Sequence, residues 1–249
     1  MNGYDAIASL YDAVNADVDY DGYAARIAGY LLSHGIAPGA LVAELGCGTG
    51  RITRALSALG YDMIGIDNSE GMLDAATAQG TDGGRILYLL QDMCEFELYG
   101  TVAAVVCTLD GVNHLTEDGD LEQCFSLVHN YLDPDGLFVF DLNTPLKFET
   151  EYASRDYIID GDDSVILWRN SYDAETSLCD FDITVMTREE DDRYSRDDAW
   201  WCERAYDRET VTALLAQCGF DDIVFAGEDF VSAPEKTAHR WNVSARAVK

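Results

Sequence analysis

Three glycines at alternate positions, Gly46, Gly48 and Gly50, stand between an apolar run and a stretch of helix-forming composition. The apolar run is Leu41–Leu45, and a helix is predicted from about Arg51. Glycine adopts positive φ angles without steric cost and lets a ligand lie against bare backbone. Such a turn places the N–H groups of a helix N-terminus at the carboxyl end of a strand. The pattern therefore predicts a binding loop for polar or anionic groups.

The spacing of these glycines separates two classes of cofactor. Dinucleotide-binding loops have the pattern G-x-G-x-x-G, and Arg51 stands where the third glycine of that pattern would fall. The observed spacing favours S-adenosylmethionine (SAM) over a nicotinamide dinucleotide. An oxidoreductase on the same kind of sheet is the alternative, and a preference for nicotinamide nucleotide over SAM would support it.

Short apolar segments alternate with helical stretches over the first 145 residues. We expect strands at residues 41–45, 62–66, 85–90, 103–108 and 137–142, and helices from about residue 51, from near residue 69 and over 118–132. Short apolar strands separated by helices predict a parallel sheet covered on both faces, with right-handed crossovers. Residues 133–136 predict a turn before the last of these strands.

The pattern changes over residues 146–205, where apolar and polar positions alternate. Strands expected at 164–170, at 177–188 and from about 199 to 205 predict an antiparallel insertion. A helix at 207–217 and strands at 222–226 and 241–248 then predict a hairpin at one edge of the first sheet. The chain is thus expected to divide into a core over 1–145, the insertion over 146–205, and a C-terminal part over 206–249 that completes the core.

The chain is strongly acidic, because 46 Asp and Glu residues against 16 Lys and Arg residues give a formal net charge of −30. Such a field repels phosphate backbones and disfavours binding to nucleic acid. It favours a cationic or amine-bearing substrate, although a solubilising surface or adaptation to a salty cytoplasm explains the charge as well.

Seven dispersed cysteines without a C-x-x-C pair suit reduced thiols better than a disulfide framework or a zinc site, so no metal is expected. The N-terminus lacks the basic and apolar segments of a signal peptide, and the longest apolar runs are too short to span a bilayer. We expect a cytoplasmic protein without a membrane partner.

Four segments resemble, in the same order, the motifs of class I SAM-dependent methyltransferases: residues 44–50, 65–73, 91–93 and 105–115. The opening segment 4–12 is similar to that of small bacterial small-molecule methyltransferases, among which amino-sugar N,N-dimethyltransferases and glycine N-methyltransferases are the best understood. The resemblance covers essentially the whole chain. It implies a Rossmann-like α/β fold with a seven-stranded, mostly parallel sheet and helices on both faces. It also implies SAM as cofactor and S-adenosylhomocysteine (SAH) as its product.

The first motif implies the contacts of the methionine part of SAM. Gly46, Gly48 and Gly50 would let it lie on the backbone, and Cys47 belongs to this loop as a small filler, since no histidine base accompanies it. Glu44 ends the first strand, where its carboxylate would serve the loop or, through water, the ligand's ammonium group. Stiffening of the turn is the alternative role for Glu44.

The next motifs imply the contacts of the adenosyl part. Asp67 ends the second strand and is expected to accept hydrogen bonds from both ribose hydroxyls, and Asn68 is assigned to the same site. Capping of the next helix is the alternative for this pair. Asp92 is expected to accept a hydrogen bond from the adenine amino group. Met93 and Met72 would contact the ring, with core packing as the alternative.

Tyr4 and Tyr11 lie seven residues apart, so a helix would place them on one face. They are expected to form a flap over SAM, with plain packing of an N-terminal helix as the alternative. Leu109, in the segment after the fourth strand, is also assigned to the cofactor site.

Asp110, Asn113 and His114 are the catalytic candidates, in the loop where such folds admit the acceptor. Asp110 could bind a substrate cation or take a proton, and Asn113 could orient an acceptor. His114, with an ordinary pKa of about 6.5, suits a general base. Turn, cap and surface positions are the alternatives for these three residues.

These features predict a methyltransferase that acts on a small acceptor, with nitrogen favoured over oxygen because an amine needs only an exposed lone pair. The insertion is expected to form a lid or acceptor pocket, or the interface of a homodimer. Trp168, Tyr172, Trp200 and Trp201 could line that pocket or pack within the sheet. An amino-sugar N,N-dimethyltransferase and a non-catalytic SAM-binding module are the alternative functions.

Overall fold

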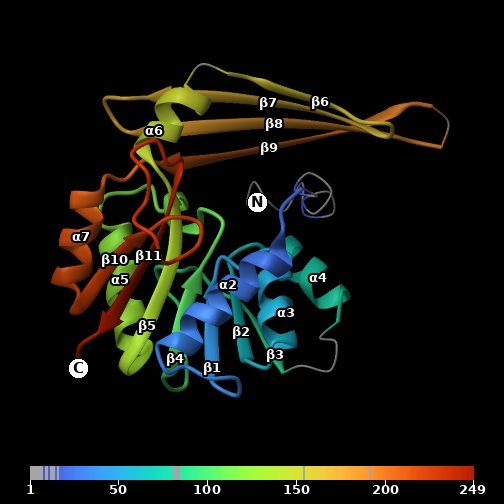
Figure 1. Cartoon of the computed structure of the whole chain (residues 1–249). Coiled ribbons are helices and arrows are strands. Elements are labelled where there is room, and N and C mark those ends of the chain that lie inside the picture. Colours follow the sequence, from blue (N-terminus) through green and yellow to red (C-terminus); the bar gives the residue numbers. More distant parts are fainter. Residues whose placement is uncertain are drawn as a thin grey trace.

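Seven strands of the described chain form one sheet, in the order β10-β11-β5-β4-β1-β2-β3 (Figure 1). The computed structural model describes residues 8, 11, 15, 17–80, 85–153, 155–190 and 192–249. The strands of this sheet are β1 (Leu41–Leu45), β2 (Asp62–Asp67), β3 (Ile86–Leu90), β4 (Val102–Cys107), β5 (Leu132–Asn143), β10 (Phe220–Ala226) and β11 (Arg240–Ala247). Strands β1 to β5 pair in parallel, and β11 is antiparallel to both β5 and β10. The predicted parallel sheet and its edge hairpin are confirmed.

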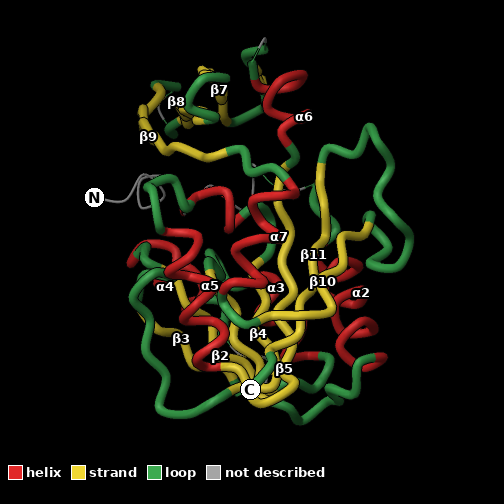
Figure 2. Tube along the Cα trace, turned by 90° about the vertical axis from the view of Figure 1, so that its left-hand side faces the viewer, coloured by secondary structure: helices red, strands yellow, loops and turns green. Residues whose placement is uncertain are grey.

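Helices cover both faces of this sheet (Figure 2). The helical elements are α2 (Tyr20–Ser33), α3 (Arg51–Ala58), α4 (Glu70–Ala78), the 3₁₀ turn η1 (Gly111–His114), α5 (Asp120–Tyr131), α6 (Pro145–Lys147), the π-helical turn η2 (Phe148–Tyr152) and α7 (Arg208–Gln217). Val42 of β1 packs in a cluster with Ile27 of α2, whereas its neighbour Ala43 belongs to the cluster that contains Phe125 of α5. Since β1 is buried on both faces, its sequence is apolar except for Glu44. The described helices lack the combination of length and hydropathy that a bilayer crossing requires.

Strand β5 begins earlier than predicted. The expected turn at residues 133–136 lies inside β5, which already pairs with β4 at Leu132. The register between the two strands shifts between Val102 and Ala104, and Asp135 has a φ of +63°. An irregularity of this kind accommodates a turn-like sequence within a strand. The predicted turn therefore lies as an irregularity within the first residues of β5 and does not separate it from a preceding element.

Within the described residues, four antiparallel strands form a second sheet, in the order β6-β7-β8-β9. They are β6 (Tyr157–Asp160), β7 (Ser164–Asp173), β8 (Leu178–Arg188) and β9 (Tyr194–Arg204). Figure 1 shows that this sheet, which we call the lid, lies across one end of the first sheet. The antiparallel insertion is confirmed. Strand β6 was not predicted, because its four residues are too few to show alternation.

The aromatic residues of the lid mostly pack within it. The rings of Trp168 and Trp201 lie 6.2 and 5.7 Å from the ring of Phe181. Tyr172 belongs to the same aromatic cluster, whereas Trp200 is 59% exposed. Sheet packing therefore accounts for three of the four residues that the sequence left between packing and pocket lining.

We expect Gly50→Ala to destabilise the fold. Gly50 has a φ of +73°, and an added Cβ atom would lie 2.4 Å from the Tyr88 hydroxyl. An L side chain in this region costs about 1–2 kcal/mol, and the close contact adds to that cost. Urea unfolding measures the loss. The control is Gly29→Ala at an exposed position of α2, where nothing lies within 4 Å. It should be neutral or stabilise the protein by roughly 0.5–1 kcal/mol. Equal free energies of unfolding for the two variants would contradict the prediction.

Candidate active site

The glycine loop after β1 is tied to the end of β2. Gly46, Gly48 and Gly50 all have positive φ angles, between +53° and +73°. The Gly48 N–H donates to Oδ2 of Asp67 over 2.8 Å. Helix α3 starts directly behind the loop, with Gly50 as its N-cap residue. The loop therefore presents backbone, rather than side chains, next to the Asp67 carboxylate.

Asp67 and Asp92 follow neighbouring strands and are linked through Asn68. Oδ1 of Asp67 accepts from the Ser69 N–H over 2.9 Å, and Nδ2 of Asn68 donates to Oδ2 of Asp92 over 3.0 Å. The other oxygen of Asp92 accepts from the Cys94 N–H over 2.8 Å. These hydrogen bonds fix the orientation of both carboxylates at the same edge of the sheet.

A cavity of about 360 Å³ opens beside this chain of hydrogen bonds, within the roughly 300–1,000 Å³ typical of small-molecule sites. Its lining residues follow the carboxyl ends of β2, β3 and β4: Asn68, Asp92, Met93, Cys94, Glu95, His114, Leu115 and Asp120. The structure thus brings together three residues assigned to the cofactor, Asn68, Asp92 and Met93, with the catalytic candidate His114.

The donor and acceptor groups at this cavity fit an adenosyl ligand. Asn68 and Asp92 offer amide and carboxylate groups, and Met93 offers a flexible apolar surface for a ring. Space for the rest of such a ligand exists at Gly48, where an added Cβ would meet nothing within 4 Å. These residues, with Asp67, could therefore hold SAM.

Met72, which the sequence left between an adenine contact and core packing, lies in the core. Met72 is 2% exposed and does not line the cavity. It shares the buried face of α4 with Leu73 and Ala76, because its position in the helix directs it toward the sheet. Core packing, the alternative role, is therefore favoured, and a contact of Met72 with the adenine ring stays a prediction.

Glu44 is buried behind the loop and stabilises it through hydrogen bonds. It is 2% exposed, and its carboxyl group accepts hydrogen bonds from the hydroxyls of Thr53 and Thr108. Burial raises the pKa of Glu44 to about 8, although these two hydroxyls partly oppose the shift. Glu44 therefore joins β1 to α3 and to the end of β4, and the alternative that it stiffens the turn is favoured.

The side chains of two further residues assigned to the cofactor are buried or half-buried. Cys47 is 6% exposed, and burial raises the pKa of its thiol well above the usual range, as expected of a filler. Leu109 packs against the cluster beneath α2, outside the cavity lining, and its N–H donates to Oδ2 of Asp141 over 2.7 Å. A cofactor contact through the Leu109 side chain stays a prediction.

Tyr11 lies beneath the lid, packed against a cluster that includes Ile166 and Ile183. Burial raises the pKa of its phenol, and the nearby carboxylates of Asp110 and Asp67 raise it further. Tyr11 is therefore located between the lid and the two sides of the site, where a flap over SAM would have to lie. Tyr4, the other predicted flap residue, lies outside the described residues.

The prediction that Asn113 orients an acceptor is wrong. Its side chain is fully buried, and Nδ2 donates to the carbonyls of Arg204 over 2.8 Å and of Asn143 over 3.4 Å. Its Oδ1 accepts from the Asn143 N–H over 2.8 Å. The amide is occupied in joining η1 to β5 and to the lid, so nothing of it is presented to a ligand.

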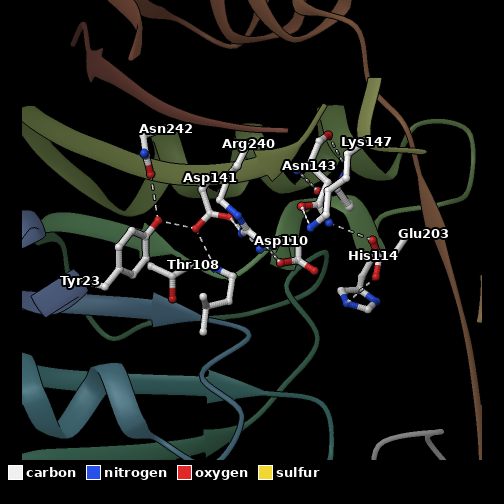
Figure 3. A network of polar contacts seen from close by, with 12 residues as sticks. Tyr23, Thr108, Asp110, His114, Asp141, Asn143, Lys147, Glu203, Arg240 and Asn242 are labelled. Carbon is white, nitrogen blue, oxygen red and sulfur yellow. Dashed lines mark hydrogen bonds and ion pairs between the residues drawn. The ribbon is translucent and has the colours of Figure 1, made fainter. Parts of the chain in front are cut away.

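Asp110, His114 and Glu203 converge beside the cavity (Figure 3). One ligand atom from each residue lies within 4.8 Å of those of the others, and Nε2 of His114 is 4.0 Å from Oε1 of Glu203. Asp110 and His114 come from the loop after β4, whereas Glu203 comes from β9 of the lid. The site is therefore assembled from the core and the lid together.

Burial and charge give these three groups different protonation states. Burial lowers the pKa of His114, and the Asp110 carboxylate only partly opposes this shift. Burial and the Asp110 carboxylate raise the pKa of Glu203 to about 8. Burial also acts to raise the pKa of Asp110, but the Arg240 guanidinium and other nearby cations hold it below its usual value. These shifts favour a neutral imidazole on His114, a protonated Glu203 and an ionised Asp110 near neutral pH. Cation binding by Asp110 fits this state better than proton acceptance.

Three charged residues of this site were missed from the sequence: Glu203, Lys147 and Arg240. Nη2 of Arg240 donates to Oδ1 of Asp110 over 2.6 Å, and Nζ of Lys147 donates to Oδ1 of Asn143 over 2.9 Å. Cations are scarce in this chain, and that scarcity could have drawn attention to Lys147 and Arg240. No comparable signal distinguishes Glu203 among the 46 acidic residues.

Two comparisons of the sequence point to one activity. A family model for a methyltransferase domain matches residues 42–136, which run from β1 into β5. The Bacillus subtilis protein YqeM is 29% identical over 220 residues. Its name assigns it as a methyltransferase by inference and states no acceptor. The match covers 87% of this chain and 86% of YqeM.

Solved structures extend the likeness to the whole chain. A SAM-dependent methyltransferase from Clostridium acetobutylicum matches with a TM-score of 0.88 at 25% identity, and both chains are covered completely. SAM-bound CalS10, an amino pentose methyltransferase from Micromonospora echinaspora, matches with a TM-score of 0.75 at 18% identity, over 96% of this chain and 97% of CalS10. At that identity the likeness to CalS10 concerns the fold alone. Because the coverage includes residues 146–205, the lid belongs to the shared architecture.

We expect Asp67→Ala to weaken SAH binding about 10- to 100-fold, because a charged acceptor of hydrogen bonds contributes about 1.5–3 kcal/mol. Titration calorimetry with SAH measures the change, and a thermal melt confirms that the variant folds. Asp62→Ala, at the opposite end of β2, is the matched control and should leave the affinity unchanged. Wild-type affinity in Asp67→Ala would remove Asp67 from the cofactor site.

Proposed function

Because the chain carries a SAM-dependent methyltransferase domain over residues 42–136, we propose that it methylates a nitrogen atom of a small acceptor. When bound, SAM supplies the electrophilic methyl group. The glycine loop, Asp67, Asn68, Asp92 and Met93 would hold it. The remaining tasks are to place the acceptor, to take up its proton and to exclude water, and they belong to this chain's own residues.

The position of His114 carries the proposal. Its ring lines the cofactor cavity and faces Glu203 and Asp110 on the acceptor side. An amine arrives at neutral pH mostly as an ammonium ion, a form that the anionic Asp110 stabilises. The ion must lose a proton before its lone pair is available, and the neutral imidazole of His114 is a suitable acceptor for that proton.

The position of the lid is consistent with a small acceptor. Its strand β9 places Glu203 over the site, and it is fastened to the core where Arg204 forms an ion pair of 2.9 Å with Asp118. The backbone of Arg204 also accepts the hydrogen bond from Asn113. Holding two reactants in a covered site in productive orientation can supply roughly 7–11 kcal/mol of catalysis. A sheet fastened across the site in this way favours a small acceptor over a macromolecular one.

An acceptor screen tests the proposed function. SAH is first titrated by calorimetry, and transfer of labelled methyl from SAM is then measured on amines, amino sugars, phenols and alcohols. We expect methylated amines. Transfer to hydroxyl compounds alone would contradict the preference for nitrogen, and selective transfer to amino sugars would support the amino-sugar alternative. SAH binding without transfer to any acceptor would support a non-catalytic SAM-binding module.

We expect His114→Gln to lower kcat on an amine acceptor by about 10²-fold, because the proton acceptor is lost, while SAH affinity is nearly unchanged. In the wild type, kcat/KM should rise with pH as His114 loses its proton. Because burial lowers the pKa of His114, this acidic limb should lie below pH 6.5, the ordinary value. Initial rates across pH 5–9 measure the limb, which should be missing from the variant. His34→Gln, at the C-terminal end of α2, is the control. An identical pH profile in His114→Gln would assign the proton transfer to another group.

A further inference from the structure

Asp141, at the end of β5, gathers four hydrogen-bond donors on one buried carboxylate (Figure 3). Its side chain is 0% exposed. The backbone N–H groups of Leu109 and Asp110 each donate to it over 2.7 Å. The Tyr23 hydroxyl from α2 and Nη1 of Arg240 from β11 supply the other two donors. Asp141 therefore joins α2, β5 and β11 to the loop that carries the catalytic candidates.

The two backbone groups that Asp141 holds belong to a strained segment. Leu109 and Asp110 have φ angles of +55° and +61°, a region that costs a residue with a side chain about 1–2 kcal/mol. Two such residues in succession require an external constraint. Hydrogen bonds from N–H groups to an ionised carboxylate are stronger than neutral ones and supply that constraint here.

Arg240 connects the same carboxylate to the substrate side of the site. One of its terminal nitrogens donates to Asp141, and the other donates to Oδ1 of Asp110 over 2.6 Å. The side chain of Asp110 is 22% exposed, whereas that of Asp141 is fully buried. Of the two carboxylates that share this guanidinium, only Asp110 is exposed enough to meet a ligand. Asp141 and Arg240 hold it in position.

We propose that Asp141 and Arg240 are positioning residues for the methyl transfer. They hold the Asp110 carboxylate where it meets the acceptor, in a loop conformation that Leu109 and Asp110 would not keep by themselves. Asp141 is fully buried, and neither residue lines the cofactor cavity. The inference rests on the proposed function, because it assigns the acceptor contact to Asp110.

Amide hydrogen exchange of the full-length protein tests the positioning without any acceptor. In the wild type, the amides of Leu109 and Asp110 should be protected, and Asp141→Asn should accelerate their exchange at least tenfold. Arg246→Lys is the matched control, since Arg246 lies on the same strand as Arg240 but pairs with Asp222 at the surface. Unchanged exchange in Asp141→Asn would overturn the proposal.

A double-mutant cycle tests whether this positioning acts through Asp110. With the amine found in the acceptor screen, Asp141→Asn and Asp110→Asn should each lower kcat/KM about 10- to 100-fold. The double variant should be no slower than Asp110→Asn alone, while SAH affinity is retained. Equal costs of Asp141→Asn with and without Asp110 would overturn the proposal, because its effect would then be general.

If Asp141→Asn does not fold, Arg240→Lys provides a second test of the proposal. An ammonium group cannot bridge two carboxylates as the planar guanidinium does, so kcat/KM should fall about tenfold with little change in SAH affinity. Wild-type kcat/KM in Arg240→Lys would contradict the role assigned to Arg240. A wild-type protein that methylates no amine would contradict the proposed function, whereas the exchange experiment would still decide whether Asp141 holds the loop.

Discussion

Glu44 of β1 pairs with Gly65 of β2 on one side and with Val106 of β4 on the other, so that three parallel strands end side by side. Because parallel strands bring their carboxyl ends to the same edge, the glycine loop, Asp67 and the loop around Asp110 meet there. The crossover helices lie on the faces of the sheet and leave this edge open. The strand order reverses at β1, so the segments that follow β1 and β4 run to opposite sides of the sheet. The cavity forms at this edge. The rest of the site depends on this pairing.

Two carboxylates then shape the two loops by the same means. Asp67 accepts the N–H groups of Gly48 and Ser69, and Asp141 accepts those of Leu109 and Asp110. In each case, charge-assisted hydrogen bonds hold a loop next to a ligand space. Their environments differ, because Asp67 is half-buried at the edge of the sheet while Asp141 is fully enclosed. Asp67 can therefore both shape its loop and bind a ligand, whereas Asp141 can only shape its loop.

The charge of the site differs from the charge of the chain. Overall, acidic residues outnumber basic ones by almost three to one, yet the anions Asp110 and Asp141 lie close to the cations Arg240 and Lys147. Glu203, whose pKa is raised to about 8, adds little negative charge near neutral pH. The site is thus close to electrically balanced. Under the proposed function, selection of an amine would depend on the positions of Asp110 and His114 more than on the net charge of −30.

The sequence by itself determined the parallel sheet, the glycine loop and the places of Asp67 and Asp92 at the ends of their strands. Each depends on a short segment, in which an apolar strand is followed within a few residues by glycine or a polar side chain. Only the tertiary structure decided the contacts of Glu203, Arg240 and Asn113. Glu203 and Arg240 reach the site from the lid and from the last strand, and their own segments carry no sign of that contact. Asn113 lies in the expected loop but is buried by the lid and β5, which no local pattern encodes. Spacing along the chain specifies a strand, a turn and the start of a helix because those interactions are local, whereas burial and charge pairing depend on segments that meet only after folding.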